Sequence, residues 1–241
     1  MELDEYARIA AAEDDHWWYR NIRALMADLL RPWLRRDQLV LDAGCGPGGN
    51  SAWLGKHGTV IGTDLSPEAL GLLRARHPAT RAVRGDVHAL PFPRDTFDVV
   101  VDVTLLYTVD DDGGAVRELA RVLRPGGVAL LVEPAFEALR RAHDRTVHSR
   151  HRYRRYTLAE LVTESGLWVQ RATYACWYLA PPAALLGIVD RVRRPAPGGA
   201  GSDLERPALG AMFTRLANAE RSWLRRHDVP FGTSAVVLAT K

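Results

Sequence analysis

The most informative segment of this chain reads Val40-Leu41-Asp42-Ala43-Gly44-Cys45-Gly46-Pro47-Gly48-Gly49. An apolar run ends in an acid, a glycine-dense turn follows, and the residues from about 50 to 57 have helical character. Gly44 and Gly46 have no Cβ, so a ligand can lie directly against their backbone. The helix that follows offers free N–H groups to an anionic group such as a carboxylate. The segment therefore predicts a strand, a turn and a helix that together bind a small molecule.

Two further acids follow the glycine turn at equal intervals of 22 residues. Asp64 ends a second apolar segment, 59–63, and Asp86 follows a glycine and precedes the apolar residues of Leu90-Pro91-Phe92. An acid about 20 residues beyond such a turn is placed to bind the hydroxyls of a ribose. A carboxylate at position 86 can accept a hydrogen bond from an adenine amino group.

The glycine turn by itself also fits a dinucleotide site. Gly44, Gly46 and Gly49 satisfy the pattern G-x-G-x-x-G, in which the helix N-terminus binds a pyrophosphate. Asp42 would repel a pyrophosphate but would attract an ammonium group. The acid therefore favours a cofactor that carries an ammonium group over a nicotinamide dinucleotide, and methyl transfer over hydride transfer.

Four ordered segments resemble the class I S-adenosylmethionine-dependent methyltransferases, in the group related to the ubiquinone and menaquinone methyltransferases. They are VLDAGCGPGG, GTDLSPEAL, GDVHALPFPRDTFDVVV and ELARVLRPGG, which stand in the family's order and spacing over residues 38–133. The resemblance implies S-adenosyl-L-methionine as the cofactor and S-adenosyl-L-homocysteine as the product. It also implies that Gly44 and Gly46 face the methionine part of the cofactor and that Asp64 holds the ribose hydroxyls. The other contacts that we expect are Leu65 on the adenine face, Asp86 and Val87 at the adenine edge, Asp42 through water or backbone, Tyr19 or Trp18 from the N-terminal segment, and Thr104 after the fourth strand.

Alternating strand and helix patterns predict an α/β fold with right-handed crossovers. We expect a Rossmann-like seven-stranded sheet, mostly parallel, with an antiparallel last strand as in the family, helices on both faces, N-terminal helices and a helical insert before the last strand. The expected strands are 38–42, 59–63, 80–84, 97–102, 128–132, 168–175 and 234–240. The expected helices are two within 4–36, then 50–57, 67–76 after an N-cap at Ser66, 113–123, one capped by Thr157 that ends before Gly166, and 207–226.

Length and composition indicate one domain of 241 residues, without the cysteine pairs of a metal or disulfide site. Residues 1–36 are expected to form a helical cover, 38–133 the cofactor-binding core and 134–241 the acceptor half. The acidic start, Met1–Glu5, does not resemble a signal peptide, and we expect a cytoplasmic protein. The net charge of +3 comes mostly from arginine, and no RNA-binding module accompanies it, so nucleic acid is not the expected partner.

An unusually long connection, about 176–230, separates the last two expected strands. Residues 172–189 carry no charge, but Pro181 and Pro182 interrupt them, which argues against a membrane-spanning helix. An apolar lid, a homodimer contact and a shallow membrane-facing helix stay open as interpretations. A flexible linker is expected at 195–203.

The acceptor side should lie beyond the fourth and fifth strands. Tyr107 stands where many relatives carry a histidine, and it either orients the acceptor or packs. His143 and His148 are the candidate general bases, with surface or structural roles as the alternative. Seven arginines between 140 and 155 form either a solvated helix face or a binding site for an anionic group of the acceptor.

The sequence thus predicts a methyltransferase with a small-molecule acceptor, apolar in its body and anionic at one end, in a biosynthetic pathway. Two other functions stay open. The first is cofactor binding for non-methylating chemistry or regulation, and the second is methylation of protein or RNA. The acceptor atom, whether oxygen, nitrogen or carbon, is not specified by these residues.

Overall fold

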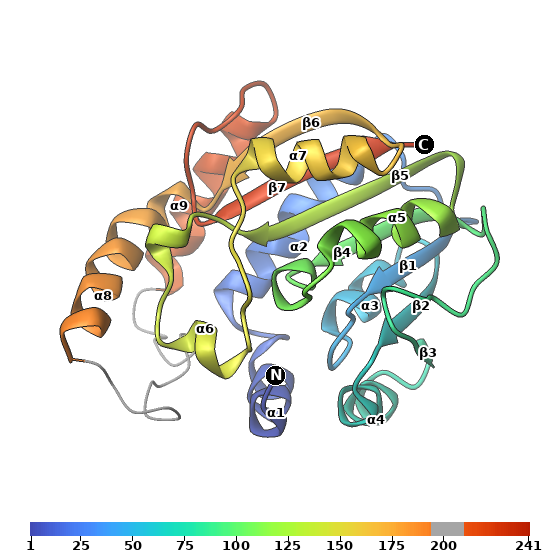
Figure 1. Ribbon diagram of the computed structural model, residues 1–241, viewed down its shortest axis with the longest axis horizontal. Coiled ribbons are helices and arrows are strands. Elements are labelled where there is room, and N and C mark those ends of the chain that lie inside the picture. The colour runs from blue at the N-terminus through green and yellow to red at the C-terminus, as the bar shows by residue number, and fades with distance from the viewer. Residues whose placement is uncertain (194–209) are drawn as a thin grey trace.

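The computed structural model describes residues 1–193 and 210–241, which surround one seven-stranded sheet (Figure 1). The strand order is β3-β2-β1-β4-β5-β7-β6, and β7 runs antiparallel to both of its neighbours. This arrangement confirms the expected fold class. The strands are β1 (Leu39–Ala43), β2 (Thr59–Asp64), β3 (Arg81–Arg84), β4 (Phe97–Val103), β5 (Leu123–Pro134), β6 (Trp168–Ala175) and β7 (Ser234–Thr240).

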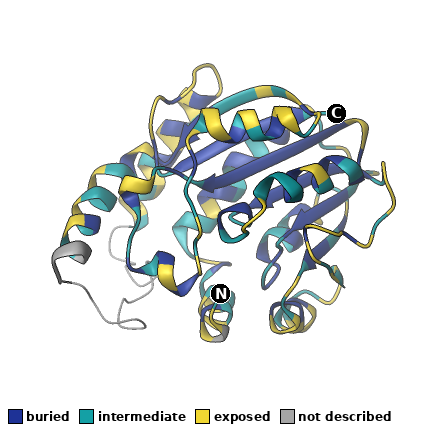
Figure 2. Cartoon of the chain, in the orientation of Figure 1, coloured by how far each residue is buried: buried dark blue, intermediate teal, exposed yellow. Residues whose placement is uncertain are grey.

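Helices cover both faces of the sheet and bury its central strands, whereas β3 at one edge is exposed or half-buried (Figure 2). One face packs against α5 and α7, and the other against α2 and α9. Alternate residues of one strand serve the two faces, as Val100 and Val101 of β4 show. The helices are α1 (Leu3–Ala12), α2 (Trp17–Leu30), α3 (Gly49–Leu54), α4 (Pro67–Arg76), α5 (Asp112–Val122), α6 (His143–Thr146), α7 (Arg155–Glu164), α8 (Ala180–Arg193) and α9 (Gly210–Leu224), with short 3₁₀ turns η1 (Leu106–Thr108), η2 (Glu137–Leu139) and η3 (Trp177–Leu179).

The structure confirms the expected N-cap of α4 and contradicts that of α7. Ser66 caps α4 as expected, since its hydroxyl accepts a hydrogen bond from the backbone N–H of Ala69 at 3.1 Å. The expectation that Thr157 caps α7 is wrong, because the helix begins at Arg155. Thr157 lies inside the first turn, where its hydroxyl accepts from the backbone N–H of Arg154 at 3.1 Å. It therefore completes a capping interaction from the helical side.

Strand β5 is longer than the expected 128–132, because the Pro-Gly-Gly segment is included at its start. The backbone N–H of Gly126 donates to the carbonyl of Lys241 at 2.9 Å, and the N–H of Lys241 donates to Gly127 at 3.2 Å. The segment is thus tied to the residue that follows β7. Helix α3 is shorter than expected and ends at Leu54.

The connection between β6 and β7 forms η3, α8 and α9 in its described part. Helix α9 packs on α2, and Arg221 donates to Asp28 at 2.8 Å between them. Glu220 is buried and accepts from the backbone N–H groups of Cys176 and Trp177 at 2.9 and 2.8 Å. The expected linker at 195–203 lies outside the described residues. Within residues 1–193 and 210–241, no helix is both long and apolar enough to cross a membrane.

The glycine turn yields a prediction about stability. Gly48 precedes α3 with φ +95°, and a Cβ there would lie 2.6 Å from Cγ of Leu73. Gly48→Ala should therefore lower the free energy of unfolding by about 2 kcal/mol or more, from backbone strain and the clash. Urea denaturation measures this change.

The matched control is Gly71→Ala in α4, where nothing lies within 4 Å of the new Cβ. This change should stabilise the protein by roughly 0.5–1 kcal/mol, since alanine favours a helix. Equal effects of the two substitutions would contradict the assigned turn geometry.

Candidate functional site

A cavity of about 930 Å³ opens at the carboxyl ends of β1, β2, β4 and β5. We call it the central cavity. Its walls come from the glycine turn, the ends of β2 and β4, the N-terminal helices, the segment around α6, and α8 and α9. Eight of the nine expected cofactor-binding residues line it, namely Tyr19, Gly44, Gly46, Asp64, Leu65, Asp86, Val87 and Thr104.

The glycine turn is shaped by positive φ angles and close packing. Gly44 has φ +68°, and a Cβ at this position would lie 2.9 Å from Cβ of Leu105. Gly46 has φ +52° and nothing within 4 Å of the place where its Cβ would be. The turn therefore packs on the segment after β4 at Gly44, and it presents bare backbone at Gly46.

Asp64, at the end of β2, is bound to the turn. Its carboxylate accepts from the backbone N–H groups of Gly46 and Ser66, both at 2.9 Å. Burial raises the pKa of Asp64, and these hydrogen bonds oppose the rise. Tyr6 from α1 lies beside it, and burial together with the charge of Asp64 raises the pKa of Tyr6 to about 12. Helix α1 thus covers the acid that we expect to bind ribose.

Asp42 is the one expected cofactor residue that does not line the central cavity. Its side chain is buried beneath the turn and accepts from the hydroxyl of Ser51 in α3 at 2.5 Å. Burial raises the pKa of Asp42 to about 7. The structure therefore places Asp42 as a support of the turn and of α3, without direct contact with the cavity.

An unsatisfied arginine stands beside the glycine turn. Nη2 of Arg23 is buried and has no hydrogen-bond partner among the described residues, while its Nε donates to Asn50 at 3.3 Å. Both Arg23 and Glu13 lie close to Gly49, where a Cβ would meet them. Arg23 does not itself line the central cavity, but Asn50, to which it donates, does. An arginine donor beside the start of α3 suits a carboxylate-bearing ligand such as the methionine part of the expected cofactor.

Tyr6, Glu13 and Arg23 were not predicted because they approach the turn and Asp64 from α1, its C-cap and α2, which are distant in the sequence. Glu13 is buried, forms an ion pair with Arg76 of α4, and has a pKa raised by burial. Arg76 also binds Asp14 at 2.7 Å. Arg23 alone had a local signal: it lies four residues after Tyr19, which places both side chains on one face of α2.

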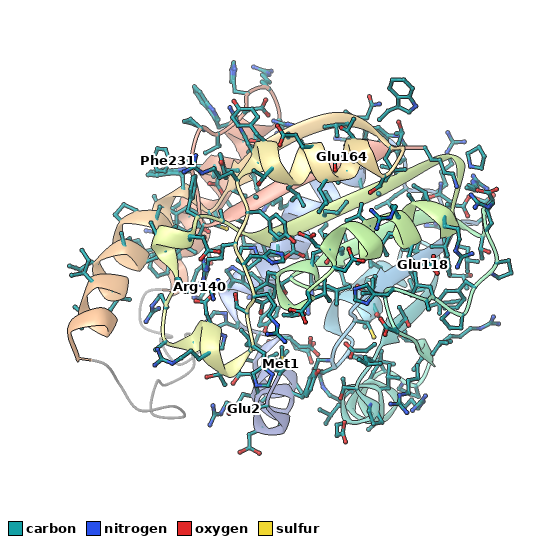
Figure 3. The ribbon with its side chains drawn as sticks, viewed as in Figure 1. Met1, Glu2, Glu118, Arg140, Glu164 and Phe231 are labelled. Atoms are coloured by element: carbon teal, nitrogen blue, oxygen red, sulfur yellow. The ribbon has the colours of Figure 1, made fainter. Side chains whose placement is uncertain are left out.

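The three candidate catalytic residues, Tyr107, His143 and His148, all line the central cavity. Tyr107 is 7% exposed, and burial and Glu133 raise its pKa well above the usual range. Nε2 of His143 lies 3.9 Å from the buried carboxylate of Glu5, and Nδ1 of His148 lies 3.3 Å from the amino nitrogen of Met1. The start of α1, labelled at Met1 and Glu2 in Figure 3, thus lies against α6.

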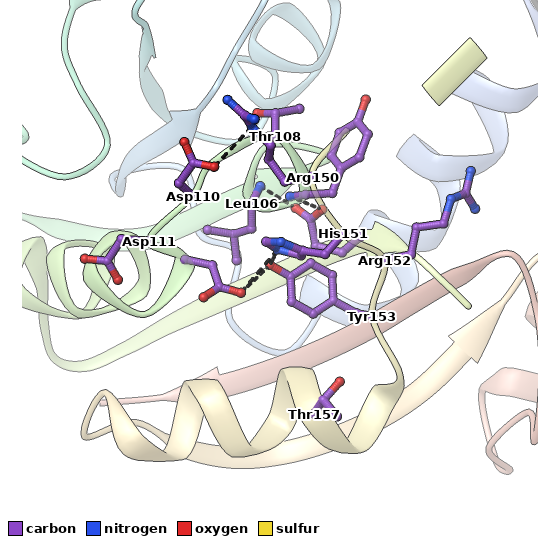
Figure 4. A network of polar contacts seen from close by, with 12 residues as sticks. Leu106, Thr108, Asp110, Asp111, Arg150, His151, Arg152, Tyr153 and Thr157 are labelled. Carbon is purple, nitrogen blue, oxygen red and sulfur yellow. Dashed lines mark hydrogen bonds and ion pairs between the residues drawn. The ribbon is translucent and has the colours of Figure 1, made fainter. Parts of the chain in front are cut away.

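Much of the arginine cluster is paired within the protein. Arg140 binds Glu137 at 2.9 Å, Arg150 binds Asp110 at 3.2 Å (Figure 4), and Arg152 binds Asp144 at 2.8 Å. Burial opposes the charge of Asp144, but the hydrogen bonds and charge of Arg152 outweigh it and lower the pKa of Asp144. Arg152 lines the central cavity but is paired with a buried carboxylate, which leaves it less available to an acceptor than an exposed arginine. Arg154 precedes α7 and does not line the cavity.

A second polar network lies behind the cavity wall (Figure 4). The hydroxyl of Tyr153 donates to Asp112 at 2.8 Å, and Nε2 of His151 lies 3.2 Å from the same carboxylate oxygen. The backbone of Tyr153 also bonds to Pro134 and Phe136 at 2.9 and 3.0 Å. The network therefore fastens the segment before α7 to the start of α5 and the end of β5.

Metal ligands are not gathered anywhere in the described ranges 1–193 and 210–241: no group of three or more His, Cys, Asp or Glu side chains there could hold an ion.

Comparison with known proteins places the chain among methyltransferases. A family model described as a methyltransferase domain matches residues 41–131. A malonyl-[acyl-carrier protein] O-methyltransferase of Pseudescherichia vulneris is 33% identical over 173 residues, which are 68% of this chain and 68% of that protein. A demethylmenaquinone methyltransferase of Chlorobaculum tepidum is 32% identical over 124 residues, 50% of each chain.

Other curated relatives are longer than the matched region. The chain spans 47% of the length of a malonyl-[acyl-carrier protein] O-methyltransferase of Enterobacter lignolyticus and 39% of an uncharacterized protein of Streptomyces fradiae. A Haloferax volcanii methyltransferase, solved in complex with the Trm112 activator, has a TM-score of 0.63 at 22% identity, covering 98% of this chain and 97% of that one. That likeness shows a shared fold. With the cavity, the glycine turn and the relatives taken together, the chain belongs to the class I S-adenosylmethionine-dependent methyltransferases.

Proposed function

We propose that this protein transfers a methyl group from S-adenosyl-L-methionine to a small-molecule acceptor bound in the central cavity. The observation that carries the proposal is that one cavity joins the glycine turn to a second wall that is partly apolar and partly polar. A cofactor on the turn and an acceptor on the second wall would therefore share one enclosed space. Positioning of this kind contributes a large part of the rate of an in-line transfer.

The proposed cofactor site assigns a task to each part of the turn. Gly46 presents bare backbone to the methionine part, and Gly44 lets the turn pack on Leu105. Arg23, beside the cavity wall at Asn50, supplies a donor for the carboxylate. Asp64 accepts hydrogen bonds from the ribose hydroxyls. The remaining contacts follow the cavity wall: Leu65, Asp86 and Val87 around adenine, and Tyr19 and Thr104 beside the methionine part. The bound cofactor supplies an activated methyl group on its sulfonium, so the protein has to hold and orient it.

The second wall suggests an acceptor with an apolar body and an anionic group. Its apolar part comes from the segment around α6, η3, α8 and α9, and its basic part from arginines near α6. An arginine binds carboxylate or phosphate in two parallel hydrogen bonds. The apolar residues are Leu139, Leu179, Pro182, Ala183, Leu186 and Phe213, and the arginines are Arg141, Arg150 and Arg152, the last of which is paired with Asp144.

This arrangement also supports a single-domain organisation. The N-terminal helices (1–36) and the insert (176–230) each contribute to the wall of the cavity that the core (38–133) opens. We propose that both segments cover the acceptor, and that the protein acts in the cytoplasm.

Dimerisation through the apolar side of the insert is a further part of this proposal, and light scattering tests it.

The need for a general base depends on the acceptor atom. A neutral hydroxyl or amine must lose a proton, which His143 or His148 could take from the cavity wall, while Tyr107 could orient the acceptor. A carboxylate acceptor is already ionised at neutral pH and needs no base.

Cofactor binding tests the proposal first. Titration calorimetry should show S-adenosyl-L-homocysteine binding with a dissociation constant of about 1 μM. Asp64→Ala should weaken binding by roughly 1.5–3 kcal/mol, because it removes a charged acceptor from two hydroxyls. Asp228→Ala, an exposed acid paired with Arg171 at 2.8 Å, is the control and should bind as the unchanged protein does. Tighter binding of NAD would refute the proposal.

Two arginine substitutions should separate binding from stability. Arg152→Ala leaves Asp144 buried and unpaired, so it should lower the free energy of unfolding by about 3 kcal/mol. Arg150 is half exposed and lines the cavity, so Arg150→Ala should leave stability nearly unchanged and raise KM for the acceptor. Urea denaturation and steady-state kinetics measure the two effects. An unchanged KM in Arg150→Ala would show that this arginine does not bind the acceptor.

The candidate bases can be tested on a panel of acceptors scored by a mass increase of one methyl group. With a hydroxyl or amine acceptor, replacing the true base (His143→Gln or His148→Gln) should lower kcat by about 10²–10⁴-fold. With a carboxylate acceptor, the same variants should keep kcat. If neither affects kcat for a neutral acceptor, the base lies elsewhere. Tyr107→Phe tests whether the Tyr107 hydroxyl orients the acceptor.

A further inference from the structure

Two acidic side chains meet inside the sheet, behind the wall of the central cavity. Asp102 of β4 and Glu133 of β5 are both 0% exposed. In the parallel pairing of these strands Asp102 lies opposite Leu131, so Glu133, two residues further on, faces the same side of the sheet. The two carboxyl groups lie close enough to act on each other's pKa, and a hydrogen bond can join them. Such a bond requires a proton on one of them.

Glu133 holds the segment that follows β4. Its carboxylate accepts from three consecutive backbone N–H groups, those of Leu105 at 3.0 Å, Leu106 at 2.9 Å and Tyr107 at 3.1 Å. Leu106 is among the residues drawn in Figure 4. Three N–H donors stabilise the ionised form of a carboxyl group. Burial raises the pKa of Glu133 to about 7 and these donors oppose the rise, so Glu133 is the member of the pair that ionises first.

Asp102 has the opposite surroundings. One oxygen, Oδ1, accepts from the N–H of Leu105 at 3.1 Å, whereas Oδ2 is buried with no donor among the described residues. An ionised oxygen without a donor is costly in the interior, and a second charge beside Glu133 adds repulsion. A proton on Oδ2, donated to Glu133, removes both costs. Burial and the charge of Glu133 accordingly raise the pKa of Asp102 well above its usual range.

The segment held by the pair contacts both halves of the central cavity. Leu105 packs against Gly44 of the glycine turn, and Tyr107 lines the acceptor side. Thr104 between β4 and this segment has φ +59°, which is strained for a threonine, and its N–H donates to Val132 at 2.9 Å. A strained segment of this kind keeps its shape only when its surroundings hold it.

We propose that Asp102 and Glu133 are positioning residues that share one proton, neutral Asp102 donating to ionised Glu133, and that the pair fixes residues 104–107 for binding of the cofactor and acceptor. The inference rests on the cofactor site proposed above. Neither side chain lines the cavity, so the pair acts through the backbone of Leu105, Leu106 and Tyr107.

The neighbouring titratable groups favour a single charge in the pair. Asp42 on β1 raises the pKa of Asp102. Tyr107 from η1 and Tyr153 from the segment before α7 both face the pair, and its charge raises their pKa values. Tyr153 in turn donates a hydrogen bond to Asp112 of α5. After burial and Glu133, the charge of Asp144 raises the pKa of Tyr107 further and that of Arg152 lowers it. Ionising the second carboxyl group would thus add charge beside groups that are acidic or phenolic.

The first test is the pH dependence of stability. A carboxyl group with a raised folded pKa contributes stability that is present below its unfolded pKa, near 4, and is lost as pH rises toward the folded pKa. Asp102→Asn keeps a donor to Glu133 and an acceptor for Leu105 but cannot ionise. The melting temperature of the unchanged protein should therefore fall, relative to that of Asp102→Asn, as pH rises from about 4 to 8.

The matched control is Asp98→Asn, another buried acid of β4, at the opposite end of the strand, where it accepts from the N–H of Leu39 at 2.7 Å. Its removal should not cancel the fall assigned to Asp102. Infrared difference spectra of the unchanged protein minus Asp102→Asn should contain a protonated-carboxyl band at neutral pH. Parallel melting curves for the unchanged protein and Asp102→Asn, or a missing band, would overturn the shared proton.

The second test is binding of S-adenosyl-L-homocysteine. Asp102→Asn should bind within about twofold of the unchanged protein, since its hydrogen bonds are kept. Glu133→Gln has one acceptor oxygen in place of two and should bind about tenfold more weakly or worse. Wild-type affinity in a folded Glu133→Gln variant would overturn the positioning role alone. No binding by the unchanged protein would overturn the proposed function and, with it, the positioning role.

Discussion

The close approach of the backbone at Gly44 and Gly46 is the constraint on which the rest of the site depends. The turn leaves β1 with positive φ angles, packs on Leu105 after β4, and is tied to Asp64 at the end of β2. Three neighbouring strands are thereby joined at their carboxyl ends by one short segment. Since these strands are parallel and adjacent in the sheet, everything that follows them faces the same space.

The supports of this turn are charged groups buried on either side of it. Asp42 beneath the turn binds Ser51, Glu13 beside α3 binds Arg76, and Asp102 and Glu133 behind Leu105 bind backbone N–H groups. Arg23 binds Asn50 and keeps one nitrogen without a partner among the described residues. A buried charge is costly unless it is paired or hydrogen-bonded. The burial of several such groups around one cavity lowers the stability of the fold there, which is typical of functional sites.

Local patterns were sufficient to predict the fold, and the family resemblance named eight residues that line the central cavity; that they bind the cofactor stays a prediction. Apolar runs that end at Asp42 and Asp64 mark strand ends, and Ser66 before Pro67 marks the start of a helix. Such signals depend on residues that are close in the sequence. The strand bounds 168–175 and 234–240 were also predicted correctly.

Long-range pairing explains what could not be predicted. Arg152 forms an ion pair with the buried Asp144, and nothing in the run of arginines indicates that partner. The approach of Tyr6 to Asp64 joins α1 to the end of β2, and the meeting of Asp102 with Glu133 requires the register of β4 on β5. Each of these contacts is set by tertiary structure, so composition and spacing carry no trace of it.

The most direct test of the central claim is a crystal structure of the protein with S-adenosyl-L-homocysteine. The account predicts electron density along the glycine turn, with the ribose hydroxyls on Asp64 and the methionine carboxylate on Arg23. Density for the ligand outside the central cavity, or a ribose that faces away from Asp64, would contradict it.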